Sequence, residues 1–423
     1  MKDKDIRFIY NSDKIFSIQV YIPVGSIHEK KGKSGISHFL EHMKFRKSNN
    51  HNMGTFLNLF NKVTVSNAYT TKDHTSYYLR TNDDNWKDIT KIMYELIFNT
   101  SFKNNDIETE KKIILEEKLL REPNVTKYTE IEVLLENSIL HKDNPYNNSV
   151  IGSTKDIKSI TNTDLKSYNK QYLNDYLVVV SCSKALKDKV KRYCIKTFPD
   201  SKNNPVKKLE NTQSFNYRMT VRNLPIDQNN IVLLFKSFSE MDKNKYYLDF
   251  IQDFLANNMS SLLGKKLRHE KGYTYTVLSS NESYKDYGCF RITVASNKKN
   301  NVYDILNIIF DLLTDLRENG LTEPNLKKFK KKYLNDLEYL FKDRDVKLDT
   351  FGNYLYYDRD FTIHKYKKII NEIDLEILKI IFNLLFDYHK MSFVLYGNLK
   401  NIKSTNTKIY NIIKKHRKIT ENF

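Results

Sequence analysis

One order of predicted elements occurs twice along the 423-residue chain. The first half opens with a strand-like run, FSIQVYIPV (Phe16–Val24), passes through helices and closes with a short apolar strand, LVVVSCS (Leu177–Ser183). The second half opens with NIVLLFKSF (Asn230–Phe238), passes through helices again and closes with SFVLYGN (Ser392–Asn398). A chain of this length is too long to fold around one ordinary hydrophobic core. The repeat therefore predicts two structurally similar α+β domains.

A polar segment separates the two halves. The stretch FPDSKNNPVKKLENTQSF (Phe198–Phe215) combines Pro with several Asn residues, which interrupt helices and strands. We therefore predict an N-terminal domain at residues 1–200, a linker at 201–215 and a C-terminal domain at 216–423.

Composition limits the class of protein. Hydrophobic residues make up 40% of the chain and aromatic residues 13%, which excludes a disordered protein. Cys182, Cys194 and Cys289 are odd in number and far apart, so they favour a reducing compartment over a disulfide framework or a thiolate metal site. The N-terminus shows no signal sequence, and no apolar run is long enough to span a membrane. We expect a soluble, cytoplasmic protein without a membrane partner.

The net charge of +19 favours polyanionic partners in principle, whether nucleic acid, anionic membrane or acidic peptide. Lys and Arg are nevertheless scattered among Asp and Glu, and only KSTNTKIYNIIKKHRK (Lys403–Lys418) concentrates positive charge. A solvated, Lys-rich surface explains this distribution. We therefore expect no nucleic-acid partner; a nucleic-acid binder remains an alternative that a steeply salt-dependent affinity would reveal.

The stretch GISHFLEHMKF (Gly35–Phe45) holds two of the ten histidines of the chain. On an α-helix His38 and His42 lie one turn apart and face the same way, so both imidazoles can bind one metal ion. A catalytic zinc site uses three protein ligands and leaves one position for water. Glu41, on the adjoining edge of the helix, is placed to take a proton from that water and deliver it to a leaving amine. The alternative is a pair of surface histidines on an amphipathic helix.

The third metal ligand must come from elsewhere in the fold. A predicted helix at about Asp106–Arg121 contains ETEKKIILEEK, in which Glu110 and Glu117 lie two turns apart and share one face. Glu116 and Lys118 point elsewhere and are interpreted as surface charges. The pair Glu110 and Glu117 thus supplies the candidates for the third ligand.

With these residues assembled, the chain resembles the pitrilysin/insulinase family of zinc metallopeptidases, the inverzincins, whose HxxEH motif reverses the order of HExxH. The resemblance spans nearly the whole chain and is to the small members of similar length, the group of mitochondrial processing peptidase and related bacterial peptidases. It implies that each α+β domain is an antiparallel-rich sheet packed with helices, and that the two domains form one half of a clamshell.

The resemblance also assigns roles at the metal site. GSIHEKKGKSGISHFLEHMKF is similar to the family segment in which a Gly and a Glu precede the metal helix. It implies that His38, His42 and Glu117 bind one Zn²⁺ per chain and that Glu41 is the general base. A second Glu precedes the third ligand by seven residues in the family, and Glu110 matches it.

Two further segments resemble substrate-binding parts of the family. NAYTTKDHTSYY is similar to the edge strand along which substrate lies as an added β-strand, and Asn67, Ala68 and Thr70 carry this match. MSSLLGKKLRHEKGYTYTV is similar to the segment whose Arg and Tyr bind substrate near the scissile bond, and Arg268 and Tyr275 match them. An Arg can hold a peptide carbonyl while a Tyr hydroxyl donates to the developing oxyanion.

The resemblance implies a zinc-dependent endopeptidase that encloses unstructured peptides in a dimeric chamber and hydrolyses them by Glu41-assisted attack of zinc-bound water. A chain of this length should form a homodimer, or a heterodimer with a related subunit. Its substrates would be peptide debris, presequences or the leader of a ribosomally made peptide, and the positive charge favours acidic peptides. The alternative is a non-catalytic peptide-binding subunit of a heterodimeric peptidase, against which the intact HxxEH motif argues.

Overall fold

Contacts divide the chain into two compact units. The N-terminal unit comprises Met1–Thr126, Pro145–Asn211 and Arg344–Asp360, and the C-terminal unit comprises Lys127–Asn144, Thr212–Asp343 and Phe361–Phe423. Most of the predicted linker at 201–215 lies outside the described residues. The computed structural model describes residues 5–12, 14–46, 48–50, 53–121, 135, 138–201, 210, 212, 214–296, 302–340, 344–358, 360–399 and 401–420.

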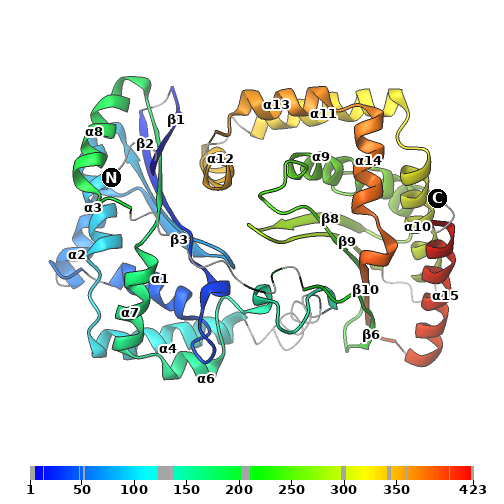
Figure 1. The fold of residues 1–423 in the computed structure, drawn as a ribbon, viewed down its shortest axis with the longest axis horizontal. Coiled ribbons are helices and arrows are strands. Elements are labelled where there is room, and N and C mark those ends of the chain that lie inside the picture. Colours follow the sequence, from blue (N-terminus) through cyan, green and yellow to red (C-terminus); the bar gives the residue numbers. More distant parts are fainter. Residues whose placement is uncertain are drawn as a thin grey trace. The chain divides into compact units, whose positions relative to one another are not determined.

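A five-stranded sheet forms the centre of the N-terminal unit (Figure 1). Its spatial order is β1-β5-β2-β4-β3, with β1 parallel to β5 and every other neighbouring pair antiparallel. Strand β5 lies between β1 and β2 and is buried along its whole length, which explains its continuous apolar run LVVV. The strands are β1 (Ile6–Tyr10), β2 (Ile15–Ile22), β3 (Val65–Thr70), β4 (Thr75–Asn82) and β5 (Leu177–Cys182).

Helices pack on one face of this sheet and enclose the core of the unit (Figure 1). The core joins Ile18 and Val20 of β2 to Phe39 of α1 and Met93 of α3, all fully buried. The apolar residues of α3 recur at helical spacing, so one side of that helix faces the sheet. The helices are α1 (Ile36–Arg46), α2 (Met53–Leu59), α3 (Trp86–Phe98), α4 (Asn104–Arg121), α6 (Thr154–Ser159), α7 (Asn162–Tyr172) and α8 (Lys187–Thr197).

The opposite face of the same sheet carries a helix from the second half of the sequence, α12 (Arg344–Tyr357). Its Tyr356 ring stacks on Tyr21 of β2 with the ring centroids 5.5 Å apart. The hydroxyl of Tyr357 donates to both carboxylate oxygens of Asp73, at 3.0 and 2.9 Å. Local sequence patterns did not predict this crossing, because they define a helix without defining the sheet on which it packs.

The C-terminal unit repeats the sheet of the first. The spatial order is β6-β10-β7-β9-β8, again with one parallel pair, β6 with β10, and three antiparallel pairs. The prediction of two similar α+β domains, each with an antiparallel-rich sheet, is confirmed. The strands are β6 (Met219–Asn223), β7 (Asn229–Lys236), β8 (Thr276–Ser283), β9 (Gly288–Ser296) and β10 (Met391–Gly397).

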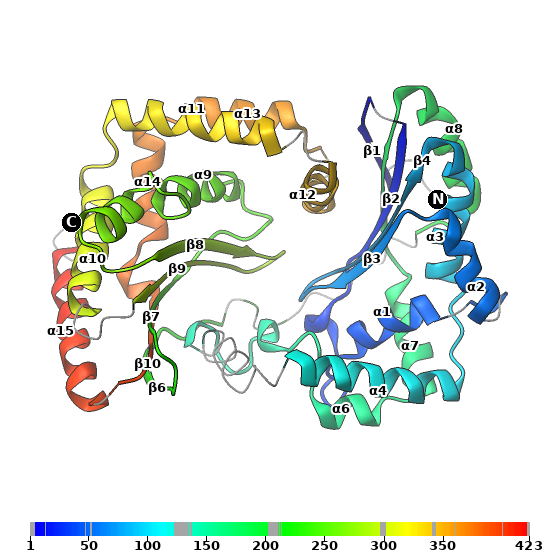
Figure 2. The same ribbon diagram turned by 180° about the vertical axis from the view of Figure 1, so that it is seen from behind.

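The helices of the C-terminal unit surround its sheet (Figure 2), and the core between them combines aliphatic and aromatic side chains. Phe254, Phe310 and Phe382 are fully buried there. The basic stretch Lys403–Lys418 lies within the last helix, which buries Ile409 on its inner side. No helix in the described part of the chain is both long and apolar enough to cross a bilayer. The helices are α9 (Lys245–Leu255), α10 (Val302–Glu318), α11 (Glu323–Leu340), α13 (Ile363–Glu372), α14 (Leu375–Leu385) and α15 (Ile402–Thr420).

Candidate metal centre

The HxxEH motif lies on α1, and the residues before it fix where that helix begins. Gly35 has a φ of +89°, and a Cβ there would lie 2.5 Å from the carbonyl oxygen of Ile151, so only Gly fits. The carboxylate of Glu29 accepts hydrogen bonds from the backbone N–H groups of Gly35 (2.7 Å) and Ser37 (2.9 Å). Burial raises the pKa of Glu29 to about 7, although these bonds lower it. A carboxylate at this position satisfies donors of the first helical turn.

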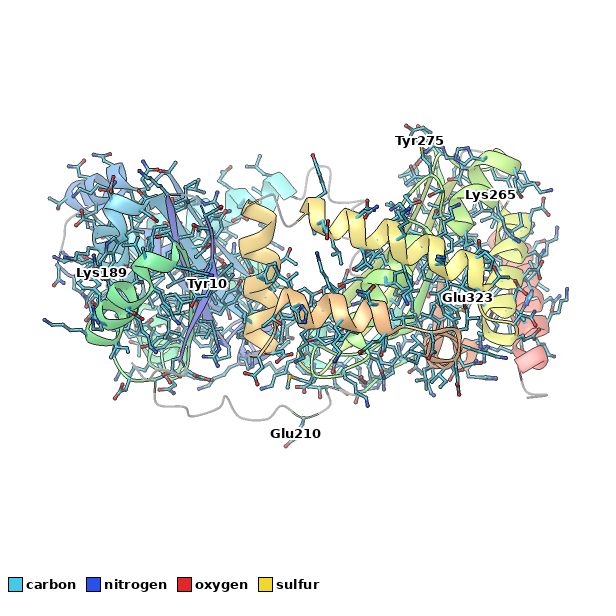
Figure 3. The ribbon with its side chains drawn as sticks, turned by 90° about the horizontal axis from the view of Figure 1, so that it is seen from above. Tyr10, Lys189, Glu210, Lys265, Tyr275 and Glu323 are labelled. Atoms are coloured by element: carbon cyan, nitrogen blue, oxygen red, sulfur yellow. The ribbon has the colours of Figure 1, made fainter. Side chains whose placement is uncertain are left out.

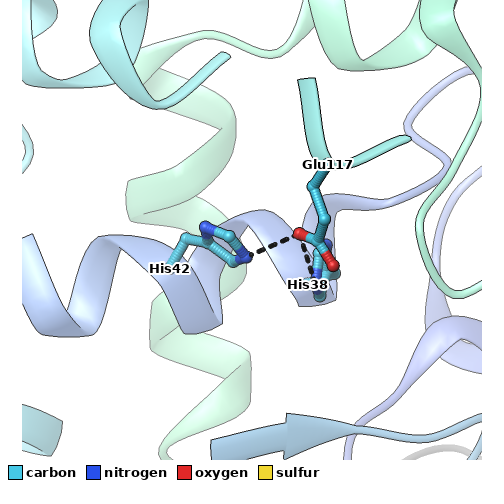
Figure 4. A group of neighbouring side chains, drawn as sticks. All are labelled: His38, His42 and Glu117. Atoms are coloured by element: carbon cyan, nitrogen blue, oxygen red, sulfur yellow. Dashed lines mark ion pairs between the residues drawn. The ribbon is translucent and has the colours of Figure 1, made fainter. Parts of the chain in front are cut away.

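Three side chains from two helices converge beside α1 (Figure 4). The Nε2 atoms of His38 and His42 lie 3.6 and 3.3 Å from Oε2 of Glu117, which is on α4. The three ligand atoms all lie within 4.8 Å of one another. Glu116, next in sequence to Glu117, is exposed on α4.

These distances fit a zinc site. Ligand atoms about 2.0–2.2 Å from a tetrahedral Zn²⁺ are separated from one another by about 3.3–3.6 Å. Two imidazole nitrogens and one carboxylate oxygen are also donors typical of a catalytic zinc site, which keeps a fourth position open. The donor set of His38, His42 and Glu117 therefore fits this metal.

Glu110 supports the site from the other side of the His42 ring. Its Oε1 lies 2.9 Å from Nδ1 of His42, which directs Nε2 of that ring toward Glu117. Arg46 follows His42 by one helical turn, and its Nη1 atom lies 3.7 Å from Oε2 of Glu110. Burial lowers the pKa of His42, but the hydrogen bonds to Glu110 and Glu117 outweigh it and raise the pKa to about 9. Metal binding at neutral pH must therefore displace a proton from His42.

Replacing Glu110 by Gln should weaken zinc binding by about 10- to 100-fold while the protein stays folded, because a neutral amide holds the His42 ring less firmly than a carboxylate. Competition with a chelator of known zinc affinity measures the change. Glu108→Gln is the matched control, since Glu108 is exposed on the same helix and forms an ion pair with Lys111 (2.8 Å). Equal zinc affinity in wild type and Glu110→Gln would contradict this role.

Glu41 is buried, with 8% of its surface exposed, although it is ionisable. Its Oε2 accepts a hydrogen bond of 2.6 Å from the hydroxyl of Thr70, the last residue of β3. A cleft of about 700 Å³ opens next to Glu41 and His42 and is bordered by Asn67 and Ala68 of the same strand. β3 is the outer strand of its sheet, so it can pair with a further strand.

Arg268 and Tyr275 lie in the C-terminal unit. The guanidinium of Arg268 lies over the ring of Tyr275, 4.5 Å from its centroid. Arg268 belongs to a π-helical segment, Gly264–Glu270, a conformation often found at functional sites. Tyr275 is 79% exposed and projects from the surface of this unit (Figure 3). A place for these two residues in the active site stays a prediction.

Sequence reasoning missed three contacts of the site. Glu29 was noted only as a Glu before the metal helix, and its hydrogen bonds to that helix depend on loop geometry. Arg46 follows His42 by one helical turn, a spacing that could have indicated it. Thr70 was assigned to substrate, and its bond to Glu41 joins a strand to a helix, which no local pattern reveals.

Comparisons with known proteins agree with this geometry. The family model described as Insulinase (Peptidase family M16) matches residues 7–152, and the model described as Peptidase M16 inactive domain matches residues 159–333. The zinc protease YmxG of Bacillus subtilis (strain 168) is 25% identical over 367 residues, which cover 85% of this chain and 88% of that protein. The beta subunit of the mitochondrial-processing peptidase of Saccharomyces cerevisiae is 30% identical over 184 residues, which cover 43% of this chain and 39% of that subunit.

Solved structures share the fold. The crystal structure of a protease from Helicobacter pylori superposes with a TM-score of 0.81 at 23% identity, over 93% of this chain and 96% of that one. The first half of the periplasmic protease PqqL from Escherichia coli superposes with a TM-score of 0.78 at 15% identity, over 98% of this chain and 95% of that one. Both halves of the chain thus match M16 domains, and the protein belongs to the insulinase family, peptidase family M16.

Proposed function

We propose that the protein is a zinc-dependent endopeptidase that hydrolyses unstructured peptides with one Zn²⁺ per chain. The observation that carries the proposal is the convergence of His38, His42 and Glu117, with Oε2 of Glu117 3.6 and 3.3 Å from the two imidazole Nε2 atoms, beside a buried Glu41. Zinc bound to these three residues would supply a Lewis acid and lower the pKa of water to near neutrality.

Glu41 acts as the general base in this proposal. Its carboxylate takes a proton from the attacking water and passes it to the amine that leaves when the C–N bond breaks. Two features support this role: Glu41 follows the ligand His38 by three residues on α1, and it is not one of the three converging donors. Glu41 would therefore lie beside a bound Zn²⁺ without serving as one of its ligands.

Substrate binds as an added strand on β3. Main-chain pairing with Asn67, Ala68 and Thr70 selects extended peptides and makes few demands on side-chain sequence. This preference suits unstructured substrates such as presequences or leader peptides, and the net charge of +19 favours acidic ones. The outer position of β3 and the adjoining cleft of about 700 Å³ support this arrangement.

A second copy of the chain completes the chamber in this proposal. The exposed Tyr275 and its neighbour Arg268 of one copy would face the metal site of the other, where they hold a peptide carbonyl and donate to the oxyanion. A heterodimer with a related subunit would use the same surface. We place the protein in the cytoplasm, because Cys182, Cys194 and Cys289 are all free and buried.

The experiment that tests this function combines metal analysis with cleavage of an unbiased peptide library. We expect wild-type protein to contain about one zinc per chain, to cleave library peptides, and to lose cleavage with a chelator and regain it with Zn²⁺. Zinc without cleavage would favour the alternative of a non-catalytic peptide-binding subunit. Absence of bound metal would contradict the proposed site.

A further inference from the structure

Thr70 occupies a position that links the substrate strand to the general base. Side chains of a strand alternate between its two faces, so Ala68 and Thr70 share a face while Tyr69 points to the other. Tyr69 donates to Asn353 of α12 on that other face, at 3.3 Å. Thr70 instead faces α1, where its hydroxyl donates to Oε2 of Glu41 at 2.6 Å.

The backbone that carries Thr70 is held on several sides. Thr70 pairs with Thr75 of β4, and the turn between them is closed by a bond from the N–H of Thr71 to the carbonyl of His74 (2.8 Å). The N–H of Ser26 donates to the carbonyl of Thr71 at 3.2 Å. Asp73 of the same turn accepts both hydrogen bonds from the Tyr357 hydroxyl. The Thr70 hydroxyl is therefore presented to Glu41 from a fixed position.

Glu41 needs such a contact. A Glu side chain has three rotatable bonds, whereas proton transfer requires its carboxylate within hydrogen-bond reach of the attacking water. Hydrogen bonds to a carboxylate are short and strong, so one bond from a fixed donor restricts the orientation of the group. A displacement of about 1 Å at a reacting centre can lower the rate by about 10²-fold.

We propose that Thr70 is a positioning residue for the general base: its hydroxyl orients the carboxylate of Glu41 for proton transfer and so couples strand β3 to the chemistry. This inference rests on the proposed function and adds to it, because Thr70 then acts through Glu41 and not through its side-chain contact with substrate. In this proposal strand β3 has two roles: its main chain pairs with the peptide, and its Thr70 hydroxyl orients Glu41.

The test uses two substitutions at Thr70 and one control. Thr70→Val keeps the shape of the side chain but removes the hydroxyl, and Thr70→Ser keeps the hydroxyl. Thr81→Val is the control, because Thr81 is a buried residue of the neighbouring strand β4 whose hydroxyl donates to the carbonyl of Lys62 (2.8 Å) and does not contact Glu41. The kinetic parameters kcat and KM are measured with one peptide identified in the library, and the zinc content of each variant is measured on the same preparation.

We expect Thr70→Val to lower kcat by about 10- to 100-fold with KM changed by less than about threefold. Thr70→Ser should restore most of the activity, Thr81→Val should keep the wild-type kcat, and all three should keep their zinc. Equal losses in Thr70→Val and Thr70→Ser would show that side-chain shape matters and the hydroxyl does not, which overturns the proposal.

A binding measurement separates positioning from substrate recognition. The Kd of the same peptide is measured for Glu41→Gln and for the double variant Glu41→Gln/Thr70→Val. Both variants lack the general base, so the peptide stays intact while its binding is measured. Equal Kd values are expected; a Kd weakened about as much as kcat/KM fell would show that Thr70 binds substrate and would refute positioning. If wild type cleaves peptides and Thr70→Val has the wild-type kcat, only the role of Thr70 fails. If wild type cleaves nothing, the proposed function fails, and the role of Thr70 fails with it.

Discussion

Glu41→Gln should abolish most peptide hydrolysis while the protein keeps about one zinc per chain. The loss follows because a carboxamide cannot accept the proton of the attacking water, and a general base typically contributes about 10²- to 10⁴-fold to the rate. Zinc should remain because the converging donors are His38, His42 and Glu117. Elemental mass spectrometry and cleavage of a library-derived peptide measure the two properties on the same preparation.

A second buried glutamate provides the control for this substitution. Glu95 is 6% exposed on α3, and its carboxylate accepts both of its hydrogen bonds from the side chain of Asn50 at 3.1 Å. Glu95→Gln removes the same charge from the same unit and should leave kcat within about threefold of wild type. Loss of zinc in Glu41→Gln would make Glu41 a ligand, and full activity in that variant would place the base elsewhere.

Glu117→Gln should lose zinc, whereas Glu116→Gln should keep it. The Oε2 atom of Glu117 lies 3.3 and 3.6 Å from the two imidazole nitrogens, and an uncharged amide oxygen at that point is a much weaker ligand for a divalent cation. Glu116 is exposed on the neighbouring edge of α4. Because loss of an outer contact already costs about 10- to 100-fold in affinity, removal of a direct ligand should cost more than about 100-fold.

Titration of the apoproteins with Zn²⁺ against a competing chelator measures these affinities. Both variants change one adjacent glutamate to glutamine, so they differ from each other only in which carboxylate is lost. Thermal unfolding with the metal removed shows whether each variant folds normally. Retention of zinc by Glu117→Gln together with its loss from Glu116→Gln would reverse the choice between the two residues.

The elements with strong local signals were predicted well from the sequence. The run LVVVSCS (Leu177–Ser183) was predicted as a strand, and β5 spans Leu177–Cys182. The first strand of each sheet was missed: IRFIY (Ile6–Tyr10) and MTVRN (Met219–Asn223) are short and only partly buried. Each is held by a parallel partner from the far end of its own unit, β5 or β10, and such pairing leaves no local pattern.

The candidate site divides in the same way. Helical spacing alone predicted that His38 and His42 share a face and that Glu110 and Glu117 share another, and the structure brings these two faces together. Their roles as ligands and support stay predictions, as do the domain boundaries at 200 and 216. The contact of Thr70 with Glu41 could not be predicted, because it depends on how a strand end approaches a helix in three dimensions.

Helix α12 comes from the second half of the sequence but belongs to the N-terminal unit, so the two units cannot be separated by a single cut in the chain. A gene fragment cut at the predicted linker would encode every residue of the candidate metal site yet omit the helix that belongs with its sheet. Tyr21 would lose the ring of Tyr356, and Asp73 would lose the hydroxyl of Tyr357 in the turn directly after Thr70. The N-terminal half of the sequence therefore does not encode all of its own unit, because α12 (Arg344–Tyr357) is supplied from beyond the predicted linker.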